Sequence, residues 1–338
     1  MKVLSPNFRK VVQGIISFII LVLFSDSFAK VIFELENEIG FFNTSASESL
    51  NGSLIFDGKI KLNQKFRNND FSLQANLKPE FYSSFKTLKF NTKGSFSQNF
   101  KKSAFISSIN FRKNFYFLEN SNFNYDIFKI SLEGSHLLDH KNLILGSLNF
   151  YYRDFRNGAR NNFDVISSEV NLVKPISRYK KYKIGFYSEN FSIKTKKSYQ
   201  TGKNEGFRLG TQFGFDYKKK FVLNFNYRIL WHSDKLNGLK SYENWIRVLF
   251  AKVIFKKVTL LVLADFYLRN FDTQEGANLN LLYTSIDTEN RVHLKIEKMI
   301  TKGLDFYMKT GYQKEELVYN NSSLSGWNAN IGVEIKHK

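Results

Sequence analysis

Hydrophobic and polar residues alternate along the chain with a period of two. In the stretch FVLNFNYRILWHS (221–233), one side of the alternation is apolar: Phe221, Leu223, Phe225, Tyr227, Ile229 and Trp231. The other side is mostly polar and includes Asn224, Arg228 and His232. Because successive side chains of a β-strand point to opposite faces, this stretch predicts a strand with one apolar face and one polar face.

The same alternation recurs after residue 30, and a helical period is not sustained anywhere beyond that point. It predicts sixteen strands, or fourteen if the less regular segments are overcounted. The predicted ranges are 31–42, 52–66, 71–84, 88–100, 104–117, 124–137, 142–156, 162–174, 181–195, 204–218, 221–234, 241–256, 258–271, 279–299, 303–317 and 326–336.

The connections between these strands alternate in length. Tight turns are predicted at 67–70, 139–142, 218–220 and 255–257. Longer polar loops are predicted at 43–52, 119–124, 156–162, 194–206, 234–241, 271–278 and 318–326. Long loops at one end and short turns at the other are typical of outer-membrane barrels.

The first 29 residues have the pattern of a cleaved export signal. Lys2, Arg9 and Lys10 precede an apolar run over 11–24, and Ala29 supplies a small residue for cleavage. An uncleaved membrane anchor is the alternative, but the run is short for a spanning helix. We therefore expect a mature domain over 30–338.

The predicted strands are long, mostly 11–16 residues, and charges interrupt their polar sides in mid-strand. A dry sandwich core would exclude such charges, whereas a closed barrel in lipid turns its apolar side outward. The chain thus resembles Gram-negative outer-membrane β-barrel proteins of the porin-like kind, down to a closing strand GWNANIGVEIKHK (326–338). It departs from many of them in ending on His337 and Lys338 rather than on an aromatic residue.

The resemblance implies an all-β, transmembrane, antiparallel up-and-down β-barrel of about 16 strands in the bacterial outer membrane. Outer-membrane lipids and the barrel-assembly machinery are then the expected partners. A homo-oligomer or a periplasmic partner stays open.

The formal charge of +20 over 338 residues raises the question of nucleic-acid binding. Loss of the signal removes three basic residues and one acidic residue and leaves +18. The polar sides of the strands carry 17 Lys/Arg and 15 Asp/Glu, so the excess lies in turns and loops. Basic rims beside a bilayer can neutralise lipid phosphates, and we favour that interpretation over nucleic acid.

A barrel of sixteen strands leaves an aqueous lumen unless something fills it. The sequence therefore predicts a channel for passive diffusion of small solutes, with weak anion selectivity. Candidate pore-lining residues are Arg112, Arg153, Arg208, Arg228, Arg247, Arg291, Glu34, Glu36, Glu38, Asp287 and Glu289. The three glutamates near the N-terminus are expected to pair with Lys59 and Lys61 across a hairpin, with a Ca²⁺ site as the alternative.

Two other functions stay open: a secretion conduit for a polymer such as a polysaccharide, and a closed structural or adhesive barrel. In the conduit, the lumen positions Tyr116, Tyr151, Tyr267 and Tyr307 could stack sugars. An enzyme is not expected. His232 and Ser233 in WHSD (231–234) are strand neighbours, so they point to opposite faces. The chain has no cysteine, and its five histidines show no metal spacing, so no cofactor is predicted.

Overall fold

A computed structural model describes residues 30–44, 47–66, 68–82, 86–117, 124–138, 142–155, 162–194, 202–235, 240–271, 290–317 and 322–337. The first eight strands are β1 (Lys30–Thr44), β2 (Ser47–Phe66), β3 (Asn69–Tyr82), β4 (Lys86–Asn99), β5 (Ser103–Tyr116), β6 (Tyr125–Leu137), β7 (Leu143–Phe155) and β8 (Asn162–Ser177). The others are β9 (Lys180–Lys194), β10 (Lys203–Lys218), β11 (Val222–Asp234), β12 (Lys240–Phe255), β13 (Val258–Phe271), β14 (Asn290–Thr301), β15 (Leu304–Leu317) and β16 (Ser322–His337).

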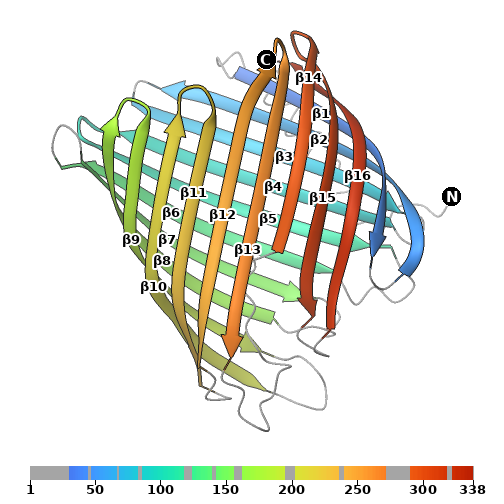
Figure 1. The fold of residues 1–338 in the computed structure, drawn as a ribbon. Helices are drawn as coiled ribbons and strands as arrows, with labels where there is room; N and C mark the ends of the chain where they lie inside the picture. The colour runs from blue at the N-terminus through green and yellow to red at the C-terminus, as the bar shows by residue number, and fades with distance from the viewer. Residues whose placement is uncertain are drawn as a thin grey trace.

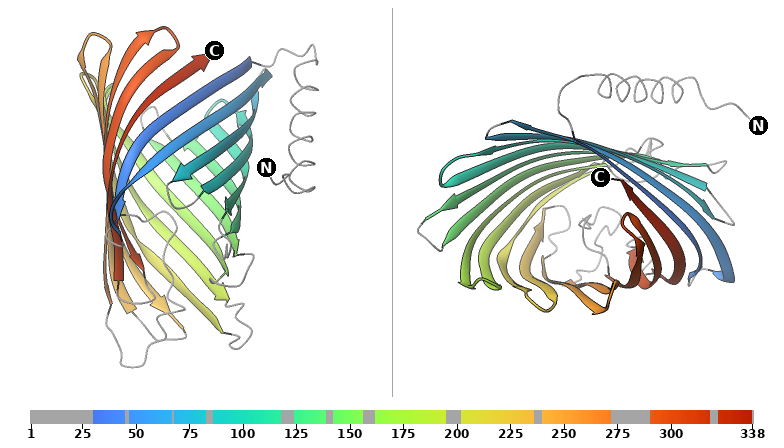
Figure 2. Two further views of the ribbon diagram at one scale, coloured as in Figure 1. Left: turned by 90° about the vertical axis from the view of Figure 1, so that its right-hand side faces the viewer. Right: turned by 90° about the horizontal axis from the view of Figure 1, so that it is seen from above.

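The sixteen strands form one closed antiparallel barrel in which each strand pairs with its neighbours in the sequence. Strands β1 and β16 close the ring, with Phe33 opposite His337 and Thr44 opposite Gly326. Figure 1 shows the blue first strand beside the red last one, and Figure 2 shows the strands running obliquely around the wall. None of the described residues forms a helix long and apolar enough to cross a bilayer.

The strand count and the up-and-down order predicted from the alternation are confirmed. Strand ends differ most at three places. The expected loop over 43–52 is mostly strand, because β1 and β2 stay paired up to Thr44 and Ser47. Strand β16 likewise begins at Ser322 rather than at residue 326. Strand β14 begins at Asn290, and residues 279–289, where an earlier start was predicted, lie outside the described residues, as does the predicted signal over 1–29.

The register settles which face each side of the alternation occupies. Arg228 lies opposite Gln212 on β10 and Trp245 on β12, and His232 lies opposite Arg208. These side chains interact with one another inside the ring. The other face carries exposed apolar residues such as Phe213, Ile229 and Trp231. The polar side therefore faces the lumen and the apolar side faces outward.

The outward face of β8 gives the thickness of the apolar belt. Ile166, Val170 and Leu172 are exposed, and the charged residues Asp164 and Lys174 bound this stretch. Ten residue steps separate the two charges. At about 3.3 Å per step and a strand tilt of about 40°, they lie about 25 Å apart along the membrane normal. That height equals the apolar band of outer-membrane barrels, so the closed barrel is a transmembrane barrel of the bacterial outer membrane.

Beyond that belt, at the end with the longer connections, the apolar residues of β8 and β9 change from the outward to the inward face. Phe163, Val165, Phe191 and Ile193 point inward and form a buried apolar cluster. The outward positions there are polar, with Lys194 paired to Asp164 at 3.2 Å. Since this part of the wall stands above lipid, water replaces hydrocarbon outside, and the apolar side chains pack inside. This inversion explains why β9 alternates less cleanly in the sequence.

The connections at the other end are short, as predicted. They cover 67–68, 100–102, 138–142, 178–179, 219–221, 256–257 and 302–303. Two of them use a left-handed residue, Lys257 (φ 70°) and Gly303 (φ 102°). At Gly303 an added Cβ would lie 2.6 Å from the Lys336 carbonyl oxygen, so this turn needs glycine for space as well as for φ.

The outward belt gives a first prediction. Val170→Arg places a charge near the middle of the apolar band and should lower the free energy of unfolding by about 2–4 kcal/mol. Asn190→Arg, also outward but close to the polar end of β9, should cost only about 0–1 kcal/mol. Urea unfolding in lipid vesicles measures both. Equal costs at the two positions would contradict the assignment of this belt to lipid.

Candidate functional site

Six arginines predicted to line the pore all occupy inward positions. The register runs from Arg112 through Ile127 to Arg153 across β5, β6 and β7. The remaining four belong to β10, β11, β12 and β14: Arg208, Arg228, Arg247 and Arg291. Asp287 and Glu289 lie outside the described residues.

Arg247 and Arg291 share one carboxylate. Arg247 donates from Nε and Nη2 to Asp265 on β13, at 2.5 and 3.3 Å. Arg291 Nε donates to the same carboxylate at 2.9 Å. The Asp265 side chain is fully buried, whereas those of Arg247 and Arg291 are 32% and 30% exposed. Two cations thus cover one acid and face the interior space.

Arg208 is held differently, in a buried polar cluster toward the end with the longer connections. Its Nε donates to Glu243 on β12 at 2.7 Å and its Nη1 to Glu189 on β9 at 3.0 Å. Glu243 also contacts His232 and Arg269, each at 3.1 Å. Arg208 is only 2% exposed, so it braces three strands, β9, β10 and β12, and is not free to meet a solute.

Arg228 lies between two aromatic rings near mid-height. Its guanidinium carbon is 4.5 Å from the centroid of Tyr187 and 4.7 Å from that of Trp245. Its nitrogens donate to Gln212 and Glu169, both at 2.8 Å. Stacking and hydrogen bonding fix the plane of this guanidinium.

Arg153 and Arg112 line the opposite part of the wall. The Arg153 guanidinium lies 4.0 Å from the centroid of Phe163 and 5.9 Å from that of Tyr125, beside the buried apolar cluster. Arg112 is exposed at its inward position. Both cations therefore lie at inward positions of the wall.

The glutamate ladder of β1 divides into separate contacts. Glu34 pairs with Lys59 at 2.5 Å, as expected. The expected role of Lys61 is wrong, because it lies opposite Ile32 in the hairpin register, while Glu36 lies opposite Asp57. The difference is one of register, since the β1–β2 connection is at 45–46.

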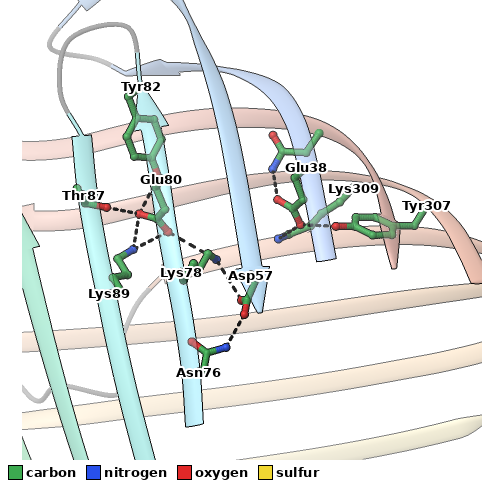
Figure 3. Close-up of polar contacts among 11 residues, drawn as sticks. Glu38, Asp57, Asn76, Lys78, Glu80, Tyr82, Thr87, Lys89, Tyr307 and Lys309 are labelled. Carbon is green, nitrogen blue, oxygen red and sulfur yellow. Dashed lines mark hydrogen bonds and ion pairs between the residues drawn. The ribbon is translucent and has the colours of Figure 1, made fainter. Parts of the chain in front are cut away.

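Glu38 crosses the seam where the barrel closes. It accepts hydrogen bonds from Tyr307 at 2.8 Å, from Lys309 at 3.3 Å and from Asn330 at 3.0 Å. These donors belong to β15 and β16, so one carboxylate of the first strand binds the last two strands (Figure 3). The Glu38 side chain is 6% exposed and that of Lys309 is 32% exposed.

A similar arrangement surrounds Glu80 on β3. It accepts from Thr87 and Lys89, both at 2.8 Å, and Lys78 lies 3.5 Å away (Figure 3). Lys78 also approaches Asp57, whose other partner is Asn76. The Glu80 side chain is 4% exposed, against 37% for Lys89.

At three sites of the lumen wall the cations are more accessible than the acid that they bind. At Asp265, Glu38 and Glu80 the carboxylate lies deep and its cations lie above it. Other pairs differ: Lys59–Glu34 and Arg228–Glu169 are about equally exposed, and in Lys295–Glu297 the acid is the more exposed partner. At Asp265, Glu38 and Glu80 the accessible charge is positive because the acid is buried more deeply than its cations, and the alternation in the sequence does not encode that depth.

Sequence reasoning missed inward charges on β9, among them Lys183 and Glu189. Lys183 pairs with Glu169 at 3.1 Å, and Glu189 accepts from Arg208. Both lie an even number of steps from Tyr187, which is also inward. The signal was obscured because the apolar residues of this strand change face partway along it.

The aromatic lumen positions offer little stacking surface. Tyr267 is 9% exposed and Tyr307 is fully buried, with the Lys295 ammonium 4.0 Å from the Tyr307 centroid. Tyr151 stacks on Phe163 at 5.8 Å. The side chain of Tyr116 lies outside the described residues. These contacts give no support to sugar stacking at Tyr267 and Tyr307.

Two further groups of side chains could suggest chemistry: the neighbours His232 and Ser233, and a group of three carboxylates. His232 contacts Glu243, and Ser233 lies on the opposite face of β11, so the two do not form a nucleophile and base. Among the described residues, three carboxylates approach within 4.8 Å of one another: Glu297, Asp305 and Glu334. Lys295 and Lys336 bind this group at 3.0–3.5 Å, so two lysines offset part of the charge of its three carboxylates.

No family model and no curated protein matches the chain. Solved structures similar to it include an outer-membrane expressed OmpT of Vibrio cholerae, with 12% identity, 91% of this chain and 97% of that chain covered, and a TM-score of 0.49. A bacterial polysaccharide outer membrane secretin is 8% identical, with 91% of this chain and 98% of that chain covered and a TM-score of 0.45. Pseudomonas aeruginosa OpdL is 9% identical, with 92% of this chain and 99% of that chain covered and a TM-score of 0.42.

The buried cluster gives a second prediction. Glu243→Gln leaves Arg208 and Arg269 without their shared counter-charge and should lower the free energy of unfolding by about 3–5 kcal/mol. Glu34→Gln removes an ion pair that is about one-third exposed and should cost no more than about 1 kcal/mol. Urea unfolding followed by tryptophan fluorescence compares the two. A stable Glu243→Gln protein would show that this cluster does not brace the wall.

Proposed function

We propose that the chain is a passive outer-membrane channel whose lumen favours small anions. The observation that carries this proposal is the partial exposure of inward cations around the wall. Arg247, Arg291, Lys309 and Lys89 face the interior yet keep about a third of their side-chain surface accessible. Water-accessible charges inside a closed ring support an aqueous lumen.

The anion preference rests on the depth of the acids. A ring of accessible cations attracts anions and repels cations at short range. Asp265, Glu38 and Glu80 lie behind their partners and reach the lumen less. A further hollow of about 630 Å³ lies against inward residues of β1 to β4, including Lys61, Asn63, Ser72 and Ser95. Its polar lining suits hydrated solutes.

Current through single proteins in a planar bilayer tests the proposal. Across a KCl gradient we expect discrete open steps and a reversal potential on the side of chloride permeation. A folded barrel that passes no current would contradict the channel and leave the closed structural barrel. Open steps with a reversal potential on the potassium side would contradict the anion preference alone.

A variant links the selectivity to the wall. Lys89→Gln with Lys309→Gln removes two accessible cations, while Glu80 keeps Lys78 and Thr87 and Glu38 keeps Tyr307 and Asn330. The reversal potential should shift toward potassium with the open steps retained. The matched control is Lys194→Gln with Lys240→Gln, which removes two exposed lysines that do not face the lumen. An equal shift in the control would refute a role for these wall positions.

A further inference from the structure

The two ends of the barrel carry very different charge. The seven short connections contain ten Lys/Arg and one acidic residue, whereas the long connections contain five of each sign. The basic excess of the chain is therefore concentrated at one rim, which we call the short-turn rim: the seven short connections and the strand ends that adjoin them. In outer-membrane barrels this end faces the periplasm.

Five stretches of the short-turn rim are exposed and carry only basic charge. These stretches, 100–102, 174–181, 218–221, 252–258 and 298–303, contain no Asp or Glu. Their basic residues are all exposed: Lys101, Lys102, Lys174, Arg178, Lys180, Lys181, Lys218, Lys219, Lys220, Lys252, Lys256, Lys257, Lys298 and Lys302. One of them, Lys181, reaches an acid outside these stretches, Asp216, at 2.9 Å.

Four of these lysines point away from the lumen. Each lies at an outward position and opposite an outward apolar or aromatic residue of the neighbouring strand. The pairs are Lys174 with Tyr182, Lys180 with Tyr217, Lys252 with Leu260 and Lys298 with Phe306. Because their side chains project on the lipid side of the wall, these four cations are not placed to steer a solute into the lumen.

Aromatic side chains form a girdle beside this rim on β9 to β12. Tyr182 contacts Phe213 and Phe215 at centroid distances of 5.9 and 5.1 Å. Farther along, Phe221 contacts Tyr217 at 4.5 Å and Phe250 at 5.5 Å. Aromatic girdles mark the level of the lipid headgroups.

Cations of the short-turn rim lie near the girdle residue Tyr217 and near Tyr179 in the turn at 178–179. The Lys180 ammonium is 6.0 Å from the centroid of Tyr217, and Lys219 and Arg178 lie 5.1 and 5.4 Å from that of Tyr179. Such long side chains lay their stems on apolar surface and carry their charge to the phosphate level. The girdle places these cations at the level of the lipid headgroups along the membrane normal, where phosphates are their nearest anions.

We propose that the short-turn rim is a binding surface for anionic phospholipids, with Lys174, Lys180, Lys252 and Lys298 as its lipid-facing phosphate ligands. Lysine near an anionic membrane surface binds by Coulomb attraction to the headgroups. An acidic protein in the periplasm would meet the turn tips but not the outward positions beside the girdle. The outward placement of these four lysines therefore favours lipid.

The test uses the full-length folded protein in bilayer nanodiscs that mix phosphatidylglycerol with phosphatidylcholine. Labelled lipids report the ratio of the two association constants at the protein surface. We expect a preference for phosphatidylglycerol that weakens as salt is raised. The variant Lys174→Gln, Lys180→Gln, Lys252→Gln and Lys298→Gln should reduce that preference at least about fivefold, the effect of a single lysine at an anionic surface.

The matched control is Lys194→Gln, Lys203→Gln, Lys235→Gln and Lys240→Gln, which removes four exposed lysines at the opposite end and should leave most of the preference. Replacement of the four rim lysines by arginine should retain the preference for phosphatidylglycerol. This variant also checks that the barrel folds with substitutions at these four positions. Three results would overturn the proposal: no preference in the wild type, equal losses in rim and control variants, or a rim variant that changes only the reversal potential.

Discussion

The structure depends on one constraint: the hydrocarbon of a bilayer offers no hydrogen-bonding partners to the backbone. Lipid cannot satisfy the N–H and C=O groups of an edge strand, so the sheet must close. Closure joins β1 to β16 along twelve residue pairs, from Phe33–His337 to Thr44–Gly326. The alternation, the outward apolar belt and the inward charges all follow from that ring, because each strand must show one face to lipid and the other to the interior.

The interior of such a ring is too wide to fill with apolar side chains alone. This barrel uses ion pairs at mid-height and a small apolar cluster where the wall rises above the lipid. In some of these pairs the acid is buried more deeply than its cations. Asp265 is enclosed while Arg247 and Arg291 stay accessible, so at this site the accessible charge is positive although the composition of the wall is nearly balanced. The net charge of the residues on a pore wall is then a poor measure of the field that a solute meets.

Much of the fold could be predicted because the signal repeats in every strand. A two-residue period over long segments predicted sixteen strands and their order. Depth could not be predicted: Arg208 and Arg247 occupy equivalent positions in the pattern, yet the first is 2% exposed and the second 32%. The difference arises from which acids the neighbouring strands supply. Glu189 and Lys183 were missed because β9 changes its apolar face between Phe186 and Phe191.

The seam at Glu38 also has a consequence for the order of assembly. Its partners Tyr307 and Asn330 lie 269 and 292 residues further along the chain. Contacts of such separation form late, because the chain entropy of closing so long a loop must be overcome first. Until β15 and β16 are in place, the edge of β1 is an open template for other strands. The carboxylate that joins the two ends of the finished ring is thus a group that acquires its ligands late, and until it does the protein is open to mispairing.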